Sequence, residues 1–267
     1  MTKLSIITPT YNAEKFIEKN INSVISQGIK DIEHIIVDSI SSDRTIDIVN
    51  KYKDHFSKII VEKDNGIYDA MNKGIIASKG DLIGILNADD YYNDQVLSLV
   101  LHNYELSSKK DVVIYGDMFN EFEQNKVLSI GNLTNSAFES GQFQINHPTV
   151  FVSKKLYERI GFFNLNYETG ADREFFLRAY HNKANFIKID KPIATFSLGG
   201  FTSTYSLQLI IRRTKEEYKI LRNYYSRSYA LKKSLIQLYR VTRNYFFYKI
   251  YGSKIFLKTR INFLKKK

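Results

Sequence analysis

The stretch DLIGILNADDYY (residues 81–92) starts as a run of apolar residues and ends in polar residues and two tyrosines. A short continuous apolar run is typical of a strand buried on both faces, as in parallel sheets. Asn87, Asp89 and Asp90 therefore stand at the end of a predicted core strand. Such side chains suit a turn, and paired carboxylates also suit Mg²⁺ or Mn²⁺, so this stretch alone leaves both interpretations open.

Three similar apolar runs precede this one, and segments with helical spacing of apolar residues separate them. This alternation predicts an α/β fold in which helices cover both faces of a mostly parallel sheet. The predicted strands cover residues 4–8, 34–38, 58–62 and 81–87, and the predicted helices cover residues 13–27, 43–52 and 66–77.

Polar residues follow each of these four strands. In a parallel sheet the carboxyl ends of the strands share one edge, where ligands bind because loops and helix N-termini present unpaired donors. We therefore expect these residues to converge on one site. They are Thr8, Thr10, Tyr11 and Asn12 after the first strand, Asp38 after the second, Asp64 and Asn65 after the third, and Asn87, Asp89 and Asp90 after the fourth.

The pattern changes after residue 100. Strands are predicted over residues 112–117 and 147–153, with a hairpin or irregular region between them, and a helix starts at Lys154. Another helix is predicted within residues 169–180. After about residue 205 the chain is predicted to form long helices rich in Tyr, Phe, Lys and Arg.

The formal net charge of +11 is concentrated in this helical extension. Residues 1–200 hold 22 Lys and Arg against 26 Asp and Glu, whereas residues 201–267 hold 17 against 2. Such a basic segment points to an anionic partner, either a membrane surface or a nucleic acid. The lack of cysteine excludes disulfides and thiolate metal sites. Because no signal peptide or membrane-spanning segment is predicted, we expect a cytoplasmic protein, soluble or peripherally bound to a membrane.

Four segments resemble, in order and spacing, the family 2 glycosyltransferases of bacterial polysaccharide biosynthesis. These inverting enzymes have the Rossmann-like GT-A fold and transfer a sugar from a nucleotide-sugar donor. The matching segments are SIITPTYNAEKFIEKNINSVISQ (5–27), IEHIIVDSISSDRTIDIV (32–49), EKDNGIYDAMNKGIIASKGDLIGILNADD (62–90) and INHPTVFVSKKLYERIGFFNLNYETGADREFFLR (145–178).

For the donor, the resemblance implies that TPTYN, including Pro9, forms the floor of the nucleotide pocket. It implies that Asp38 accepts a hydrogen bond from the base, although a cap at the strand end is an alternative. It also implies that Asp69, Asn72 and Lys73 lie beside the nucleotide and its phosphates. A helix with one polar face would need no ligand, so that alternative stays open for these three residues.

The family's acidic motif is DxD, and this chain carries the sequence NADD at the corresponding place. The resemblance implies that Asn87, next to Ala88, contacts the ribose without contributing charge. Asp89 would hold Mg²⁺ or Mn²⁺ with Asp90 in support. The cation would offset the charge that develops on the leaving nucleoside diphosphate.

Inversion requires a base that takes the proton of the acceptor hydroxyl. The resemblance places this base at Asp172 in TGADREFF, with Glu174 as a second candidate. A helix N-cap is the alternative role for Asp172. His147 is expected to contact the diphosphate or the acceptor, with a structural role as the alternative.

The extension has apolar and aromatic residues at three- and four-residue spacings, with Lys and Arg between them. This pattern predicts a basic amphipathic helix on an anionic membrane surface. The alternative is a helix that packs its apolar stripe on the catalytic domain and exposes its basic face. The stripe consists of Leu231, Leu235, Leu238, Val241, Tyr245 and Tyr248.

Together these features predict a hexosyl- or N-acetylhexosaminyltransferase that uses a nucleotide sugar, with UDP-sugars favoured, and a glycan or polyprenyl-linked acceptor. No nucleic-acid partner is expected. The alternatives are a sugar-nucleotide nucleotidyltransferase and a non-enzymatic nucleotide- or RNA-binding protein. We expect a GT-A catalytic domain over residues 1–204, with a donor half (1–100) and an acceptor half (101–204), and a basic aromatic helical tail over residues 205–267.

Overall fold

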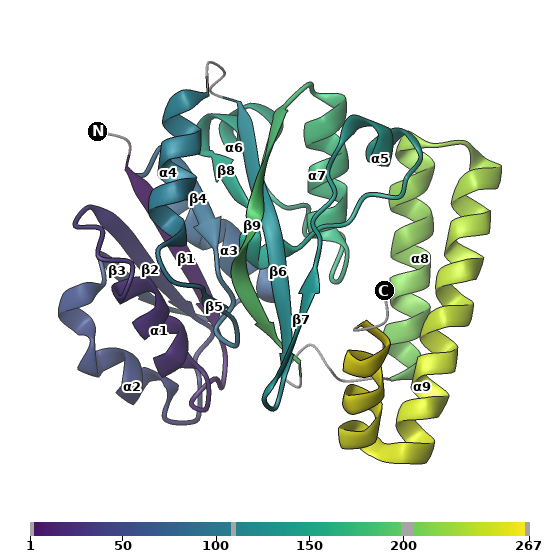
Figure 1. The fold of residues 1–267 in the computed structure, drawn as a ribbon, viewed down its shortest axis with the longest axis horizontal. Helices are drawn as coiled ribbons and strands as arrows, with labels where there is room; N and C mark the ends of the chain where they lie inside the picture. Colours follow the sequence, from purple (N-terminus) through teal and green to yellow (C-terminus); the bar gives the residue numbers. More distant parts are fainter. Residues whose placement is uncertain (1–2, 108–110, 199–205, 265–267) are drawn as a thin grey trace.

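The computed structural model describes residues 3–107, 111–198 and 206–264 (Figure 1). Within these residues a nine-stranded sheet has the order β3-β2-β1-β4-β8-β6-β9-β5, and β7 pairs with β6. The strands are β1 (Leu4–Thr10), β2 (Ile32–Asp38), β3 (Lys58–Val61), β4 (Leu82–Ile85), β5 (Tyr91–Tyr92), β6 (Val112–Phe122), β7 (Asn125–Ser129), β8 (Phe151–Ser153) and β9 (Asn185–Ser197). The helices are α1 (Ile17–Ile25), α2 (Thr45–Lys51), α3 (Ile67–Ala77), α4 (Val96–Leu106), α5 (Asn135–Glu139), α6 (Lys154–Ile160), α7 (Ala171–His181), α8 (Leu207–Tyr224) and α9 (Arg227–Leu264), with short 3₁₀ helices η1 (Lys53–His55) and η2 (His147–Thr149).

The first half of the sheet is parallel, as the alternation of strands and helices predicted. β1 pairs in parallel with β2 and with β4, and β2 pairs in parallel with β3. Every residue of β1 and β4 is buried, because helices cover both faces of these strands.

The second half of the sheet is mixed. β8 joins β4 and β6 through antiparallel pairs, and β9 then pairs in parallel with β6. The sequence pattern did not predict β9. Its apolar alternation is broken near Pro192, where the register with β6 shifts around Asp117. Proline cannot donate to the ladder, so such an irregularity is the place where a strand can accommodate it.

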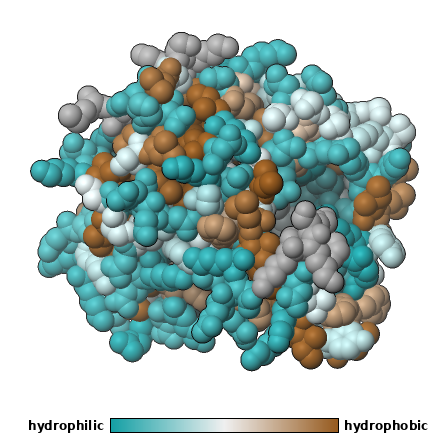
Figure 2. Space-filling view, viewed as in Figure 1, coloured by the Kyte–Doolittle hydropathy of each residue, from teal (hydrophilic) through white to brown (hydrophobic). Residues whose placement is uncertain are grey.

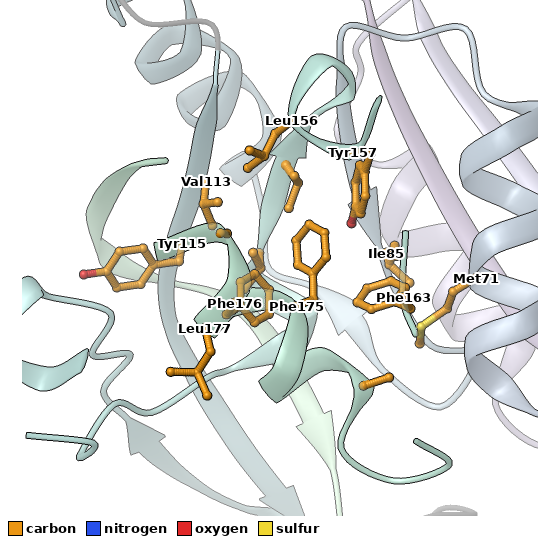
Figure 3. Close-up of a cluster of buried hydrophobic side chains, with 14 of the residues drawn as sticks. Met71, Ile85, Val113, Tyr115, Leu156, Tyr157, Phe163, Phe175, Phe176 and Leu177 are labelled. Atoms are coloured by element: carbon orange, nitrogen blue, oxygen red, sulfur yellow. The ribbon is translucent and has the colours of Figure 1, made fainter. Parts of the chain in front are cut away.

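Two hydrophobic layers sandwich the sheet. On one face, α3, α6 and α7 bring Met71, Tyr157 and Phe175 against strand residues such as Ile85 (Figure 3). On the other face, α1 and α4 pack on β1 and β4, and α2 packs on α1 and β2. These layers fix the direction of the strands and therefore the edge at which their carboxyl ends meet.

Helices α8 and α9 form an antiparallel hairpin beside the sheet domain (Figure 1). Ile220 and Leu221 of α8 are fully buried in the core that also contains α7. After Gly252, which breaks α9 with φ 77°, Phe256 and Leu257 pack on the β6–β7 hairpin. The expected domain boundary between residues 204 and 205 lies outside the described residues.

The predicted apolar stripe of the tail is divided between two sides of α9. Val241 is buried, whereas Leu231 and Leu235 are 53% and 55% exposed. Tyr239, Phe246 and Ile250 are exposed as well. Packing against the protein therefore covers only part of the apolar surface of α9.

Candidate functional site

The ends of β1, β2 and β4 bring the expected polar residues to one edge of the sheet. Thr10 lies opposite Asp38 in the register of β1 and β2, and the Leu86 amide just after β4 donates to the Ile7 carbonyl. A turn follows, in which the Asp90 amide donates to the Asn87 carbonyl at 2.9 Å. The acidic loop of residues 87–90 therefore lies next to the TPTYN segment, as the sequence predicted.

Asp90 is only 1% exposed. Its Oδ1 accepts from the Ser197 amide at 3.2 Å, and its Oδ2 has no hydrogen-bond partner within the described residues. Burial, together with the charge of Asp89, raises the pKa of the Asp90 carboxyl well above its usual range. The buried Oδ1 of Asn87 also lacks a partner within the described part of the chain. Buried polar oxygens of this kind are ready to accept a cation or a hydroxyl.

Asn20 of α1 holds the acidic loop through two hydrogen bonds. Its side-chain amide is fully buried and donates to the carbonyls of Asn87 (2.8 Å) and Asp90 (3.0 Å). Its Oδ1 accepts from the Thr8 hydroxyl, which in turn contacts His34 Nε2 at 3.1 Å. The sequence did not single out Asn20, because one asparagine on a helix carries no signal of a contact 67 residues away.

A cavity of about 210 Å³ opens beside the acidic loop. Its lining includes Asp89, Lys15, Lys19 and Glu121. Lys19 Nζ lies 3.2 Å from Glu121 Oε2 and 3.5 Å from the centre of the Tyr91 ring. The two lysines were not predicted as site residues. The available signal was their four-residue spacing just after TPTYN.

The side chains of the TPTYN segment differ in their burial and in their partners. Pro9 is buried in β1, and Thr8 is fully buried with its hydroxyl bound to Asn20 and His34. The role of TPTYN as the floor of the nucleotide pocket stays a prediction. Asn12 accepts from the Ser42 amide at 2.8 Å and thereby holds the loop after β2. Tyr11 is 48% exposed, and the buried Thr10 hydroxyl has no partner within the described residues.

Asp38 is fully buried at the end of β2. Its two carboxylate oxygens accept from the amide and the hydroxyl of Ser41. This is the strand-end arrangement that the sequence analysis gave as the alternative. A carboxylate has further lone pairs, so a contact to a nucleotide base stays a prediction.

The three polar residues of α3 differ in their contacts. Asn72 donates to the Phe163 carbonyl at 2.9 Å and accepts from the Phe163 amide at 3.0 Å. Its amide ties α3 to the loop before α7. The expected place of Asn72 beside the nucleotide stays a prediction. Asp69 accepts from the Asn65 amide at 2.9 Å, and Lys73 pairs with Glu62 at 3.0 Å. Ala88 is buried against α1, where it supports the acidic loop.

Asp172 lies in the first turn of α7, as predicted. Its Oδ1 accepts from the Tyr68 hydroxyl at 3.1 Å and from the Arg173 amide at 2.7 Å, while its Oδ2 has no hydrogen-bond partner within the described residues. Burial and the charge of Asp172 raise the pKa of Tyr68 well above its usual range, so the phenol stays protonated and donates. Tyr68 was not predicted, because it is 104 residues from Asp172.

Two other predicted residues are His147, whose imidazole is affected by the charge of Asp172, and Glu174, which lies on the same helix as Asp172. Burial lowers the pKa of His147, and the charge of Asp172 opposes that shift. The imidazole is therefore neutral at pH 7 and can accept or donate one hydrogen bond. Glu174 is 6% exposed and pairs with Arg178 at 3.0 Å. Its role as a second candidate base stays a prediction.

The acidic loop fits a divalent cation that shares its coordination with a ligand. Mg²⁺ and Mn²⁺ are commonly held by one or two carboxylates, with phosphate oxygens and waters completing the shell. Asp89 and the unpaired Oδ2 of Asp90 supply such oxygens. The described residues contain no cluster of three or more His, Cys, Asp or Glu side chains that would hold a metal without a ligand.

Comparisons with solved structures agree with this architecture. A structure of residues 1–349 of TarS from S. aureus in complex with UDP-GlcNAc superposes with a TM-score of 0.66 at 20% identity, covering 85% of this chain and 69% of TarS 1–349. A mannosyltransferase, PcManGT, from Pyrobaculum calidifontis in complex with GDP-Man and Mn²⁺ gives a TM-score of 0.62 at 13% identity, covering 98% of this chain and 85% of that chain. These similarities show the GT-A type of fold.

Sequence comparisons identify similar proteins at higher identity and a matching family. A PGL/p-HBAD biosynthesis glycosyltransferase of Mycobacterium bovis is 30% identical over 75% of this chain and 79% of its own length. An uncharacterized glycosyltransferase, EpsJ, of Bacillus subtilis is 28% identical over 71% of this chain and 59% of its own length. No helix within the described residues is long and apolar enough to cross a membrane. Residues 5–170 match the family described as Glycosyl transferase family 2, and the chain belongs to this family of glycosyltransferases.

Proposed function

We propose that the chain transfers a hexosyl or N-acetylhexosaminyl residue from a nucleoside diphosphate sugar to a glycan or lipid-linked glycan, with inversion at the anomeric carbon. The observation that supports this proposal is that the two oxygens of the Asp172 carboxylate differ in their hydrogen bonding. Oδ1 is held by Tyr68 and by the Arg173 amide, whereas Oδ2 is left to accept a proton. An anchored carboxylate with one free oxygen suits a general base.

In the reaction, Asp172 Oδ2 accepts the proton of the acceptor hydroxyl as that oxygen attacks the anomeric carbon. The bond from this carbon to the diphosphate oxygen breaks on the opposite face, and its electron pair leaves with the nucleoside diphosphate. Tyr68 keeps the carboxylate oriented, and neutral His147 contributes a hydrogen bond to the acceptor or the diphosphate. Orientation of this kind can supply a large part of the rate enhancement.

On the donor side, Asp89 and Asp90 would hold Mg²⁺ or Mn²⁺, and Asn87 would contact the ribose. The cation, when bound, offsets negative charge on the leaving diphosphate. Lys15 and Lys19 line the adjacent cavity and add positive charge there. A UDP-sugar donor is supported by the UDP-GlcNAc complex of TarS, whereas PcManGT holds GDP-Man. Asp38, at the buried end of β2, would recognise the base of the nucleotide.

Titration calorimetry tests this donor side. We expect UDP to bind in the presence of Mn²⁺ and to bind at least tenfold more weakly after Asp89→Asn, because a phosphate-bridged cation loses a charged ligand. Asp47→Asn is the control, since Asp47 is an exposed carboxylate on α2. Equal affinity of the wild type and Asp89→Asn for UDP and Mn²⁺ would contradict the proposed metal site. Mass-spectrometric screening of UDP- and GDP-sugars for turnover then identifies the donor.

We also propose that the outer side of α9 binds the anionic inner face of the cell membrane, where a lipid-linked acceptor would be held. Its exposed residues follow one another at three- and four-residue spacings and so share one side of the helix. They are Lys232, Leu235, Tyr239, Arg243, Phe246 and Ile250. The four apolar or aromatic members are each at least 55% exposed. Figure 2 shows hydrophobic and hydrophilic residues side by side at the right of the molecule, where α9 lies in Figure 1.

This composition matches a membrane boundary, where aromatic and aliphatic side chains enter the headgroup region and basic side chains contact anionic lipids. Each basic residue near such a surface is worth about 1 kcal/mol. In sedimentation with phosphatidylglycerol–phosphatidylcholine vesicles, Arg243→Gln should therefore lower the affinity about fivefold. Lys51→Gln, an exposed lysine at the end of α2, is the control. Equal sedimentation of both variants and the wild type would overturn the membrane proposal.

A further inference from the structure

The basic tail contains only two acidic residues, and both contact the segment that carries Asp172. Residues 201–267 hold 17 Lys and Arg but only Glu216 and Glu217 as carboxylates. These two lie in the middle of α8. An anionic membrane surface would repel two adjacent carboxylates, so membrane binding does not explain their position.

Glu216 binds the backbone just before α7. Its Oε1 accepts from the Glu168 amide at 2.9 Å, and its Oε2 accepts from the Thr169 amide at 2.9 Å and the Thr169 hydroxyl at 2.6 Å. The side chain is 7% exposed. Hydrogen bonds from buried amides to a carboxylate are among the stronger ones in proteins. Since Gly170 at the start of α7 makes no side-chain cap, the contacts of Glu216 hold the approach to this helix.

The neighbouring contacts of α8 hold the other side of Asp172. Glu217 Oε2 lies 3.1 Å from Arg173 Nε, and the Arg173 guanidinium stacks over Phe143 with 4.1 Å to the ring centre. A Cβ added to Gly170 would lie 2.9 Å from Ile220 Cδ1, so α8 packs directly on the Gly170 backbone. Residues on both sides of Asp172 are therefore fixed by one helix of the tail.

We propose that Glu216, in the middle of α8, is a positioning residue for Asp172. Glu216 does not touch the substrate. It sets the path of residues 168–170, and this path sets where the Asp172 carboxylate stands relative to the acceptor hydroxyl. This inference rests on the proposed role of Asp172 as the base. A displacement of about 1 Å at a catalytic group can cost about 100-fold in rate.

The main test is Glu216→Gln, which keeps the size of the side chain but replaces one acceptor oxygen with an amide group that faces donors. We expect kcat for transfer to fall about 10- to 100-fold. The KM for the donor and the calorimetric affinity for UDP with Mn²⁺ should stay within twofold of the wild type, because Glu216 binds the loop before α7 rather than the acidic loop or the end of β2. This split between kcat and donor binding separates positioning from a general loss of folding.

Arg212→Ala is the matched control. Arg212 lies one turn earlier on α8 and pairs with the side chain of Glu168, in an exposed ion pair that does not involve the loop backbone. Exposed pairs contribute little, so kcat should be unchanged. Thr169→Val removes only the hydroxyl contact to Glu216 and should lower kcat by less than Glu216→Gln does.

Comparison with Asp172→Asn distinguishes the two proposals. Loss of turnover in Asp172→Asn together with a kcat of Glu216→Gln within twofold of the wild type would overturn the positioning role alone. A lower melting temperature of Glu216→Gln with unchanged kcat below that temperature would overturn it too, since this result describes a purely structural residue. Retained turnover in Asp172→Asn would instead remove the base role on which the inference rests.

Discussion

The proposed donor side of the site consists of TPTYN, Asp38 and the acidic loop, and its proposed base side consists of Asp172 and the segments that hold it. The two sides bring their residues together over different distances in the sequence. On the donor side, β1, β2 and β4 deliver TPTYN, Asp38 and the acidic loop from within the first 90 residues. On the base side, Asp172 is held by Tyr68, and its loop is held by Glu216 of the tail. The donor side is thus a product of neighbouring strands, whereas the base side depends on contacts between distant segments.

This difference has a consequence for how each side responds to substitution. The donor side rests on a buried chain of side chains that runs from His55 through His34, Thr8 and Asn20 to the acidic loop. Damage there should reduce stability and donor binding. The base side is held at its periphery by α3 and α8, so damage there should reduce turnover while the fold and donor binding persist.

Asp172→Asn is expected to have the largest effect. Loss of the base should lower kcat for transfer by about 10² to 10⁴, while calorimetry still detects UDP with Mn²⁺ at the wild-type affinity. The control is Asp47→Asn, which changes a carboxylate in the first turn of α2 rather than α7. A loss of donor affinity as large as the loss of kcat would mean that Asp172 also contributes to donor binding and that the two sides do not act independently.

Acid should destabilise the donor side through His34. Burial, with His55 adding to it, lowers the pKa of His34 from 6.5 to about 3. Below pH 6.5 the unfolded chain binds a proton that the folded protein excludes, so stability is lost as pH falls toward 3. One such group removes up to about 1.4 kcal/mol per pH unit once the unfolded histidine is protonated, or about 2 kcal/mol in total between pH 6.5 and 4.5.

Urea unfolding at several pH values measures this effect. In His34→Gln the pH dependence between 6.5 and 4.5 should become shallower by about one proton. His102→Gln, on the exposed side of α4, serves as the control and should leave the slope unchanged. If the slopes of the wild type and His34→Gln are the same, the buried chain does not carry this titration.

Asn20→Ala should affect the donor side by removing two hydrogen bonds to the acidic loop. The Asp90 carbonyl would lose its bond to Asn20, and the Asn87 carbonyl would keep only its bond from the Asp90 amide. This loss should cost about 1 to 3 kcal/mol in the free energy of unfolding. Donor affinity with Mn²⁺ should fall as well. Asn22→Ala, an exposed residue on the same helix, should change neither quantity. Intact donor binding in Asn20→Ala would show that the acidic loop holds its shape without support from α1.

Tyr68→Phe should give the smallest effect, and only on the base side. It removes one hydrogen bond to Asp172 Oδ1, which is worth about 1 kcal/mol, or about fivefold in kcat. Tyr52→Phe removes a comparable hydrogen bond to Glu18 on the exposed face of the α1–α2 layer and should not change kcat. A loss in Tyr68→Phe as large as in Asp172→Asn would assign Tyr68 a direct part in the chemistry.

Much of the donor side could be predicted from the sequence. Continuous apolar runs gave the four parallel strands, and the polar residues after them gave the edge at which they meet. The partners of the Thr8 and Asn72 side chains could not be predicted, because the motif identifies residues that lie near the site without showing which partners they bind. In the structure both side chains are committed to other parts of the protein.

The sequence by itself determined the α/β class, the four parallel strands of the donor side, the helical start at Asp172 and the basic character of the tail. These features follow from apolar periodicity, turn chemistry and charge, which act over a few residues. Only the tertiary structure decided that Tyr68 and Glu216 anchor the base side, that β9 completes the sheet, and that α9 is exposed on one side and buried on the other. Such contacts depend on how layers pack, and no local pattern in the sequence records which distant segments meet.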